Sequence, residues 1–506
     1  MSLALAHSRA CTGVHAPPVR VEVYLAPGLP ALNIVGLPEA AVRESRDRVR
    51  AAIQCAQLEF PSRRITVNLA PADLPKDGGR FDLPIALGIL AANGVFDAQA
   101  LARVEFLGEL SLTGELRAID AVLPAALAAA RDGRALIVPA GNGSEAALAG
   151  DGEAYTARTL SEVVAHLNGS KRLPLARRDE VGNAPLLCAD LADVRGQGLA
   201  RRALEVAAAG AHNLLLIGPP GCGKTLLASR LPGLLPEATE AEALESAVIA
   251  SVSGRGLDLP RWRQRPFRAP HHTSSAIALA GGGPGPRPGE ISLAHNGVLF
   301  LDELAEWGRH ALEVLRQPLE SGVVTISRAG RSCEFPARFQ LIAAMNPCPC
   351  GWAGDPSGRC RCTTEVVLRY RAKLSGPLLD RIDLQVPVPR LAPSELRGSA
   401  PRGETTAAVR ERVLAARARQ QARCGKSNAG MSQAETEVHC RLHDKDQRLL
   451  ERAMAALQLS ARATQRILRV ARTLADLEAC EQIAAAHLTE AIGYRQLDRD
   501  MLLPAA

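Results

Sequence analysis

The stretch that decides the fold is Gly-Pro-Pro-Gly-Cys-Gly-Lys-Thr at residues 218–225. It follows the apolar run 214–217 (Leu-Leu-Leu-Ile) and leads directly into Leu-Leu-Ala at 226–228. This is the pattern G-x-x-x-x-G-K-[ST] in the order strand, glycine-rich turn and helix start. The glycines let backbone N–H groups turn toward phosphate oxygens, and the helix N-terminus adds partial positive charge. The stretch therefore predicts a phosphate-binding loop in a parallel α/β domain.

A second motif supports this interpretation. The apolar run 297–301 is typical of a buried strand and ends in two carboxylates, Asp302 and Glu303. We expect Lys224 to reach the β- and γ-phosphates, Thr225 and Asp302 to hold Mg²⁺, and Glu303 to polarise the attacking water. The alternative is a glycine turn and an acid-ended strand that are unrelated, and the occurrence of both motifs in this order disfavours it. The residues predicted to bind the nucleotide are Gly218, Pro219, Pro220, Gly221, Cys222, Gly223, Lys224, Thr225 and Asp302.

The composition fits a large soluble enzyme. A chain of 506 residues, 47% of them hydrophobic, is long enough for about three domains. No apolar stretch reaches membrane-spanning length, and the first residues lack a basic region followed by a long apolar one. Twelve cysteines without such a leader predict a reducing compartment, the cytoplasm. The net charge of +7 permits a nucleic-acid partner without requiring one.

Composition and periodicity divide the chain into four parts. Residues 1–170 alternate short β-like runs, such as 21–25 and 65–69, with helical stretches such as 39–57. Residues 171–188 mix charges, Pro and Gly without periodicity, which predicts a linker. From 189 to 391 helix and strand signals alternate, the pattern of a parallel α/β sheet. From 392 to 506 β-rich runs vanish and apolar residues recur at helical spacing, which predicts a helical domain.

Several features follow the phosphate-binding loop. Residues 281–289 are so rich in Gly and Pro that we expect a loop without helix or strand, and it carries Arg287. Runs at 323–326 and 332–335 flank a turn, which predicts a β-hairpin with Arg328 and Arg331 at its tip. A buried strand at 340–345 then ends in Asn346, whose amide can orient the hydrolytic water.

These pieces, in this order, resemble the AAA+ ATPases, in particular the clade of magnesium chelatase and the MCM helicases. The resemblance implies that Asn346 is sensor 1 and that Arg381 is an arginine finger. A finger acts on the nucleotide of a neighbouring subunit, so it implies a ring, in this clade usually a homo-hexamer. The alternative for Arg381 is a surface salt bridge. Arg462 is favoured as sensor 2, with Arg466 as the alternative.

Four segments resemble the signatures of the ComM/YifB family of Mg chelatase-like proteins. They are Arg-Pro-Phe-Arg-Ala-Pro-His-His-Thr-Ser at 265–274, the run 288–297, Ala-Met-Asn-Pro-Cys-Pro-Cys-Gly at 344–351, and the run 469–477. The resemblance covers essentially the whole chain. It implies an ATP-driven DNA helicase that promotes branch migration and integrates single-stranded DNA during natural transformation.

The same resemblance places DNA in a central pore. Hairpins in this clade point inward, so Arg328, Arg331 and Arg287 are expected to meet phosphates of single-stranded or branched DNA without reading bases. The first rival reading is the ATPase motor subunit of a magnesium chelatase, which acts on a protein partner. The second is a non-enzymatic scaffold. The paired His271 and His272 are expected to be hydrogen-bonded structural residues, because no acid stands at a supporting spacing.

Residues 1–170 resemble Lon-type proteases. The segment 74–82 (Leu-Pro-Lys-Asp-Gly-Gly-Arg-Phe-Asp) resembles the one that carries the nucleophilic serine, but here Arg80 stands in the serine's place. The segment 110–116 resembles the strand before the Lon catalytic lysine, and residues 118–125 contain no lysine. A Ser–Lys dyad needs both groups. We therefore expect a Lon-like α/β domain without peptidase activity.

Four cysteines form the last candidate site. They are Cys348, Cys350, Cys360 and Cys362, two C-x-C pairs separated by a Gly/Pro-rich loop. Four thiols so close in sequence can surround one tetrahedral Zn²⁺, although C-x-C pairs are tighter than the usual C-x₂-C. Reduced structural thiols and a disulfide are the alternatives. Because the cluster directly follows Asn346, we expect it to brace a subunit interface near Arg381.

Overall fold

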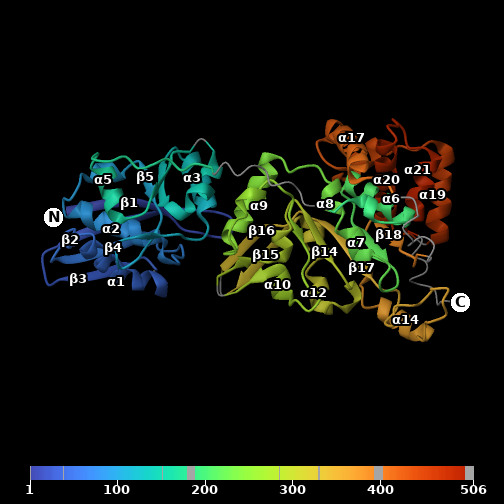
Figure 1. The fold of residues 1–506 in the computed structure, drawn as a ribbon, viewed down its shortest axis with the longest axis horizontal. Helices are drawn as coiled ribbons and strands as arrows, with labels where there is room; N and C mark the ends of the chain where they lie inside the picture. Colours follow the sequence, from blue (N-terminus) through green and yellow to red (C-terminus); the bar gives the residue numbers. More distant parts are fainter. Residues whose placement is uncertain are drawn as a thin grey trace.

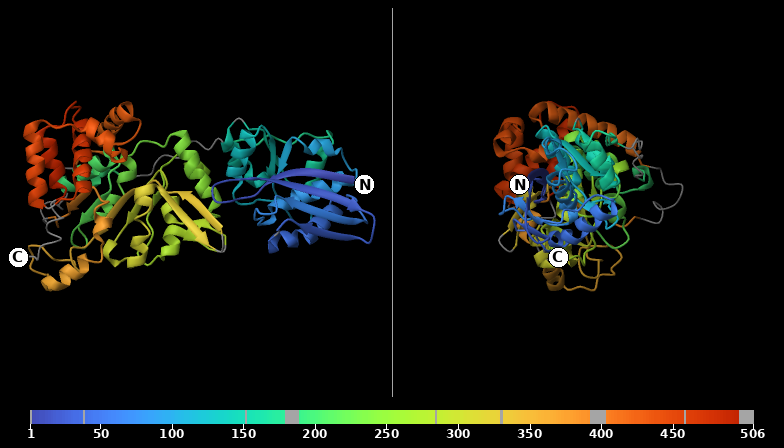
Figure 2. Two further views of the ribbon diagram at one scale, coloured as in Figure 1. Left: turned by 180° about the vertical axis from the view of Figure 1, so that it is seen from behind. Right: turned by 90° about the vertical axis from the view of Figure 1, so that its left-hand side faces the viewer.

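The computed structural model describes residues 2–37, 39–150, 152–178, 189–283, 285–328, 331–391, 403–457 and 459–495. Figure 1 shows an elongated arrangement, with an N-terminal α/β part at one end, a second sheet in the middle, and a group of helices at the other end. The view from behind in Figure 2 has the same order. The mixed α/β class is confirmed. Among the described residues, no helix combines the length and apolar character needed to cross a membrane.

The N-terminal part is built on a seven-stranded sheet in the order β3-β4-β2-β1-β5-β8-β9. Its strands are β1 (Ser2–Arg9), β2 (Pro18–Ala26), β3 (Ala31–Val35), β4 (Arg64–Ala70), β5 (Val104–Phe106), β8 (Ala135–Pro139) and β9 (Ala154–Ala157). β1–β2 and β2–β4 pair antiparallel, and the other pairs are parallel. Along β2 every second residue is buried, because one face of the sheet packs on the helices.

Its main helices are α1 (Ala40–Cys55), α2 (Asp82–Ala92), α3 (Val122–Arg131) and α5 (Leu160–Leu167), with short α4 (Gly143–Ala146) and the strand pair β6 (Glu109–Leu110) and β7 (Leu116–Arg117). All of α2 is buried, which fits its nearly unbroken apolar sequence. Leu173 is buried against this core, Leu175 bridges Tyr155, and Ala176 packs on a second N-terminal cluster, so residues up to 176 pack on the N-terminal part. The expected linker's remaining residues, 179–188, lie outside the described residues.

The central sheet has five strands in the order β11-β14-β17-β10-β18, and every pair is parallel. The strands are β10 (Leu214–Ile217), β11 (Phe267–Arg268), β14 (Val298–Leu301), β17 (Gln340–Met345) and β18 (Leu384–Pro387). Strands β14 and β17 are buried throughout because helices cover both faces, as in other parallel sheets. The predicted parallel α/β sheet is confirmed, and the segments that follow β10, β14 and β17 meet at one edge.

The helices around this sheet are mostly short. They are α6 (Gly198–Gly210), α7 (Lys224–Ala228), α8 (Leu231–Leu234), α9 (Glu240–Val252), α10 (Ala276–Ala280), α11 (Glu290–Leu293), α12 (Arg309–Glu313), α13 (Pro318–Ser321), α14 (Thr364–Arg371) and α15 (Gly376–Leu379). Of the longest two, α6 and α9, the second begins at a signal that the sequence carries. Thr239 caps α9 through a capping box with Glu242.

Two hairpins project from the central sheet. β15 (Val323–Arg328) and β16 (Arg331–Pro336) pair antiparallel, so the predicted hairpin is confirmed. The expectation that residues 281–289 contain no strand was wrong, because β12 (Gly281–Gly282) pairs with β13 (Arg287–Pro288). A Cβ on Gly281 would lie 2.3 Å from the Arg287 carbonyl oxygen. Only glycine allows these strands to approach so closely, and the composition that suggested a loop is what permits the pairing.

In the C-terminal part the regular elements formed by the described residues are all helices. It comprises α17 (Thr406–Cys424), α18 (Gln433–His439), α19 (Asp444–Leu457), α20 (Ala461–Leu477) and α21 (Ala485–Gly493). Ile467, Val470, Ala471 and Leu474 form the buried stripe of α20, at the spacing of an amphipathic helix. This stripe belongs to the same apolar cluster as α6 and β10. The helical part is therefore packed directly on the nucleotide-motif sheet.

Candidate functional site

The glycine-rich loop has the backbone that phosphate binding needs. Gly221 and Gly223 have φ of 75° and 95°, a region that glycine adopts readily. A Cβ on Gly218 would lie 2.1 Å from the Val388 carbonyl oxygen, so this position also requires glycine. Lys224 begins α7 and is only 8% exposed. The loop thus places a buried ammonium beside a cradle of backbone N–H groups.

The Lys224 ammonium joins two of the sequence motifs. Its Nζ donates to the carbonyl oxygens of Gly218 at 2.7 Å and Pro219 at 2.9 Å, and to Asn346 Oδ1 at 3.1 Å. Burial lowers the pKa of Lys224, because the low-dielectric surroundings disfavour its charge. A phosphate group would supply the anionic partner that carbonyl and amide oxygens replace here. The structure therefore brings Lys224 and Asn346 to one point, as the sequence predicts.

The two carboxylates stand on the other side of the same loop. Thr225 Oγ1 donates to Asp302 Oδ2 at 2.6 Å, and the Glu303 N–H donates to Asp302 Oδ1 at 2.8 Å. A hydroxyl and a carboxylate together are the hard oxygen ligands that Mg²⁺ prefers. Glu303 has φ of 51°, a strained conformation for a residue other than glycine. Its position is thus imposed by the surrounding structure, as is common for groups at reactive sites.

His272, expected to be a hydrogen-bonded structural residue, lies at this site, where sequence reasoning did not place it. Its Nδ1 lies 2.8 Å from Glu303 Oε2, and the rings of His271 and His272 are 4.2 Å apart. The acid partner was overlooked because it comes much later in the chain. Since β11 and β14 are parallel neighbours, the residues after them meet at one sheet edge. Predicting this contact requires the order of the strands in the sheet, which could not be read from the sequence.

Arg381 lies at the opposite edge of the central sheet. Its carbonyl oxygen accepts from Asn213 Nδ2 at 2.8 Å, and Asn213 immediately precedes β10, whereas the phosphate-binding loop follows β10. The Arg381 side chain is buried, forms an ion pair with Glu320, and donates from Nη1 to the Pro377 carbonyl at 2.6 Å. The strand therefore separates Arg381 from the loop of its own chain. The salt bridge considered as the alternative is present, but with a largely buried arginine.

The two sensor 2 candidates differ in their partners. Arg466 Nη1 lies 2.6 Å from Asp383 Oδ1 and neutralises a buried carboxylate. Arg462 has a side chain that is 71% exposed, and its Nη2 lies 3.7 Å from Glu320 Oε1. Glu320 thus stands between Arg381 and Arg462. Of the two candidates, Arg462 is the one whose guanidinium is available to an incoming anion.

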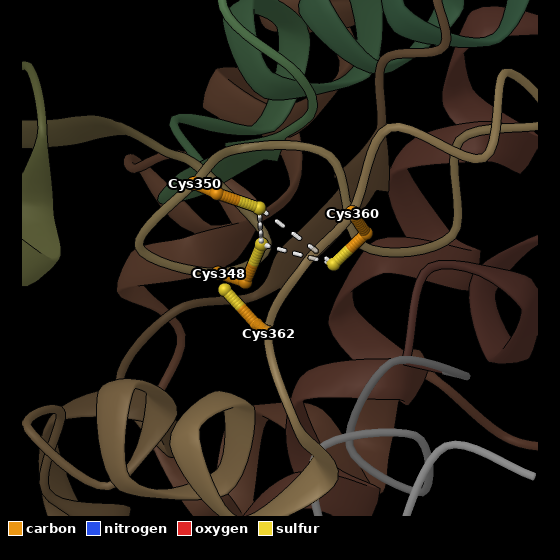
Figure 3. Close-up of side chains that lie close together, drawn as sticks. All are labelled: Cys348, Cys350, Cys360 and Cys362. Atoms are coloured by element: carbon orange, nitrogen blue, oxygen red, sulfur yellow. Dashed lines mark hydrogen bonds between the residues drawn. The ribbon is translucent and has the colours of Figure 1, made fainter.

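The four cysteines converge in space. The ligand atoms of Cys348, Cys350, Cys360 and Cys362 all lie within 4.8 Å of one another (Figure 3). Cys348 Sγ is 3.3 Å from Cys350 Sγ and 3.9 Å from Cys360 Sγ, and the last two are 3.6 Å apart. Tetrahedral zinc with Zn–S bonds of about 2.3 Å needs sulfur atoms about 3.8 Å apart. The donor set therefore fits a structural zinc ion.

Backbone N–H groups also favour the charged form of one thiol. Those of Arg361 and Trp352 lower the pKa of Cys350 to about 6. Next to it, Gly351 has φ of 83°, and a Cβ there would lie 2.6 Å from Pro220 Cδ. The cysteine loop therefore packs on the phosphate-binding loop. Within one chain Arg381 lies at the other edge of the sheet, and the expectation that the cysteine loop braces a subunit interface near Arg381 stays a prediction.

The three arginines expected to contact DNA have different surroundings. Arg328 and Arg331 are the last pair in the register of the hairpin β15–β16, and their turn lies outside the described residues. Arg287 faces the N-terminal part instead, with its Nη2 3.7 Å from Asp120 Oδ2 and its Nη1 3.5 Å from the Ser253 carbonyl oxygen. Its side chain remains 60% exposed. Arg287 therefore lies at the junction with the N-terminal part.

Comparison with known proteins agrees with the geometry. Models of the magnesium chelatase subunit ChlI match residues 190–396 and 21–142, and the model of its C-terminal region matches 403–495. The competence protein ComM of Haemophilus influenzae is 54% identical over 504 residues, which cover 99% of this chain and 98% of that protein. YifB of Salmonella typhimurium is 51% identical over 500 residues, with 99% and 98% covered.

Magnesium chelatase itself is more distant. The 67 kDa subunit from Chlorobaculum parvum is 28% identical over 157 residues, which cover 31% of this chain and 23% of that subunit. The similarity to ComM and YifB extends instead through the N-terminal α/β part, the nucleotide motifs and the helical part. This chain belongs to the ComM/YifB family of magnesium chelatase-like AAA+ proteins.

Proposed function

We propose that this protein is an ATP-driven motor that acts as a homo-hexameric ring, moves single-stranded or branched DNA, and promotes branch migration as a ComM-like helicase. One observation carries the ATPase part of the proposal. Lys224, Thr225, Asp302, Glu303 and Asn346 come from three separate segments and meet at one edge of the sheet. A scaffold without turnover would have no need for this arrangement.

Each residue has a distinct task in hydrolysis. Lys224 and the glycine-loop N–H groups would bind the phosphates, and Asn346 would orient the water. Thr225 and Asp302 would hold Mg²⁺, which offsets phosphate charge when bound. Glu303 would accept the proton of the attacking water, with its carboxylate oriented by His272. ATP is the expected nucleotide in this family.

The proposal of a ring rests on the positions of two arginines, Arg381 and Arg462. Hydrolysis builds negative charge on the transferred phosphoryl group, and arginines stabilise it. In one chain Arg381 and Arg462 meet around Glu320, with Arg381 across β10 from the phosphate-binding loop. A neighbouring subunit can present them to the loop when the two edges face each other. We therefore propose that both arginines act on the nucleotide of the neighbouring subunit. In its absence they pair with Glu320, and the phosphates of that nucleotide would replace Glu320 as their anionic partner.

We also propose that the four cysteines hold one structural Zn²⁺ in each subunit. Their sulfur separations suit tetrahedral coordination, and the loop they close packs through Gly351 on Pro220. A metal there would stiffen the loop that supports the phosphate-binding residues. Because the phosphate-binding edge would face the neighbouring subunit, the cysteine loop would then meet the partner's arginine-bearing edge.

The DNA part of the proposal rests on the ComM relative, named a competence protein, and on the confirmed hairpin. We expect Arg328 and Arg331 to contact phosphates from this hairpin. The decisive test measures ATP hydrolysis and strand displacement with and without single-stranded and forked DNA. Arg328→Ala/Arg331→Ala should keep basal ATPase and lose stimulation, and its slope of log affinity against log salt should fall by about 1.4 to 1.8, at 0.7 to 0.9 per phosphate.

The rival function is that of a magnesium chelatase motor, which acts on a protein partner. The partial match to the Chlorobaculum subunit is the observation in its favour. ATPase activity that no DNA structure stimulates, together with a double arginine variant that behaves as wild type, would favour that rival. Stimulation by forked DNA that the double variant loses would exclude it.

A further inference from the structure

The N-terminal domain packs on the ATPase core through one pair of helices, α3 and α9. Figure 1 shows α3 beside α9, and the two are in contact. Leu123 and Leu148 of the N-terminal domain share a buried cluster with Ala247 of α9. The Ala121 N–H donates to the Ser251 carbonyl oxygen at 3.2 Å. Apolar packing and a hydrogen bond occur at the same place. The interface therefore fixes the orientation of the N-terminal domain on α9 and does not merely hold the two together.

A carboxylate strengthens the same junction. Glu145 Oε1 accepts from the Ser251 hydroxyl at 2.5 Å, and the same oxygen accepts from the N–H of Leu123 at 3.1 Å. Leu123 lies in the first turn of α3, where backbone N–H groups need an acceptor. One side chain therefore caps the helix of one domain and binds the last turn of the helix of the other.

The N-terminal domain also reaches both hairpins. Gly13 sits in a turn closed by a bridge between Thr12 and His15, and a Cβ on it would lie 3.6 Å from Cys333 Cβ on β16. Asp120 Oδ2 lies 3.7 Å from Arg287 Nη2 on β13. These are the two elements expected to contact DNA. The position of each hairpin is thus linked to the turn around Gly13 and the loop at Asp120.

Arg80 holds that loop. Its side chain is buried, at 7% exposure, and Nη2 donates to the Asp120 carbonyl oxygen at 2.7 Å. Among the described residues, Nη1 has no hydrogen-bond partner although it is buried. The next residue, Ala121, has φ of 58° and donates to Ser251 from this left-handed conformation. Burying a guanidinium with so few hydrogen-bond partners costs free energy. We therefore attribute the presence of Arg80 to its anchoring of a strained turn and not to a gain in stability.

We propose that Arg80 is a positioning residue. At the place where Lon-type proteases carry their nucleophile, it fixes the 120–121 loop, which holds the N-terminal domain on α9 and keeps the two hairpins in place to respond to DNA. The DNA response rests on the proposed function, whereas the docking does not. Arg80 is thereby a coupling element between the N-terminal domain and the motor.

The test uses the full-length protein and compares Arg80→Ala with Arg80→Lys. The matched control is Arg64→Ala, which removes an exposed arginine on β4 of the same domain. We expect hydrogen exchange in peptides covering 281–288 and 323–336 to speed up about threefold or more in Arg80→Ala. The DNA concentration for half-maximal ATPase stimulation should rise several-fold, with basal ATPase near wild type. Arg80→Lys should restore part of both, and Arg64→Ala should change neither.

Ser251→Ala tests the same junction from the ATPase side and leaves the buried arginine untouched. It removes the hydroxyl that reaches Glu145, so hairpin exchange should also rise, by less. Wild-type exchange in a folded Arg80→Ala protein would overturn the proposal. If Arg80→Ala does not fold, a wild-type rate of hairpin hydrogen exchange in Ser251→Ala would overturn the proposal instead. An ATPase that DNA never stimulates would refute the proposed function instead, while hairpin exchange would still decide the role of Arg80.

Discussion

At the scale of single residues, Lys224 and Glu303 are expected to fail in different ways. Lys224→Ala removes a charged donor to the phosphates, so ATP should bind about 10- to 100-fold more weakly, the equivalent of about 1.4–2.7 kcal/mol. Glu303→Gln keeps the shape of the side chain and removes the base, so ATP should still bind while turnover falls about 10²-fold or more. Equilibrium nucleotide binding and single-turnover hydrolysis separate the two effects. Hydrolysis at the wild-type rate in Glu303→Gln would refute its assignment as base.

His272 gives a second prediction at this scale. Because its Nδ1 contacts the Glu303 carboxylate and not the phosphate loop, His272→Ala should lower kcat about tenfold with little change in the KM for ATP. His272→Gln retains a donor and should recover part of the rate. His271→Ala is the matched control, since its ring nitrogen bonds Thr273 at 2.9 Å. Steady-state ATPase assays check this, and equal kcat values for all three variants would contradict it.

The residues that could be predicted from the sequence lie in local motifs, namely the glycine loop and the polar residues that end the apolar runs 297–301 and 340–345. The glycine loop, Lys224 and Thr225 occupy one continuous motif, and their geometry follows from it. The contact between His272 and Glu303 could not be predicted, because it depends on β11 lying next to β14. The ion pair of Arg381 with Glu320 joins segments whose proximity also depends on the folded sheet.

At the scale of elements, the cysteine loop carries a prediction about metal and nucleotide together. Protein purified without chelators should contain about one zinc per subunit, and Cys360→Ser should reduce this toward zero. Because Gly351 packs on Pro220, the same variant should raise the KM for ATP. Metal analysis and ATPase kinetics measure both quantities. Cys55→Ser, an exposed cysteine outside the cluster, serves as the control. Zinc-free wild-type protein with freely titrating thiols would refute the site.

Helices and strands with a strong sequence periodicity could be predicted. Strands that depend on the close approach of two backbone segments could not. The hairpin β15–β16 and the helix α20 follow from alternation and from an amphipathic stripe. The pair β12–β13 was missed, because glycine composition indicates a loop unless the approach of Arg287 to Gly281 is known. The expected runs 21–25 and 65–69 lie within β2 and β4, whereas the antiparallel pairing of these strands required the structure.

At the scale of the whole molecule, the central sheet has two functional edges. One carries the phosphate-binding loop, the carboxylates and the cysteine loop, and the other carries Arg381. The C-terminal helices bring Arg462 to that second edge through Glu320. Under the proposed function a neighbouring subunit completes the site, since Arg381 of the same chain lies across β10 from the phosphate-binding loop. Repeating the contact between unlike edges generates a closed ring when the rotation allows it.

Mixed rings test this arrangement directly. Arg381→Ala subunits keep an intact phosphate-binding edge, and Lys224→Ala subunits keep an intact arginine edge, so each pure protein should be inactive. In random 1:1 rings, about a quarter of the sites would join the two intact halves, and ATPase should recover in that proportion if sites act independently. Mixing Arg381→Ala with the Lys224→Ala/Arg381→Ala double variant supplies no intact arginine and should recover nothing. If rings form, as measured by mass, and ATPase stays absent at every mixing ratio, Arg381 does not act on its neighbour's nucleotide.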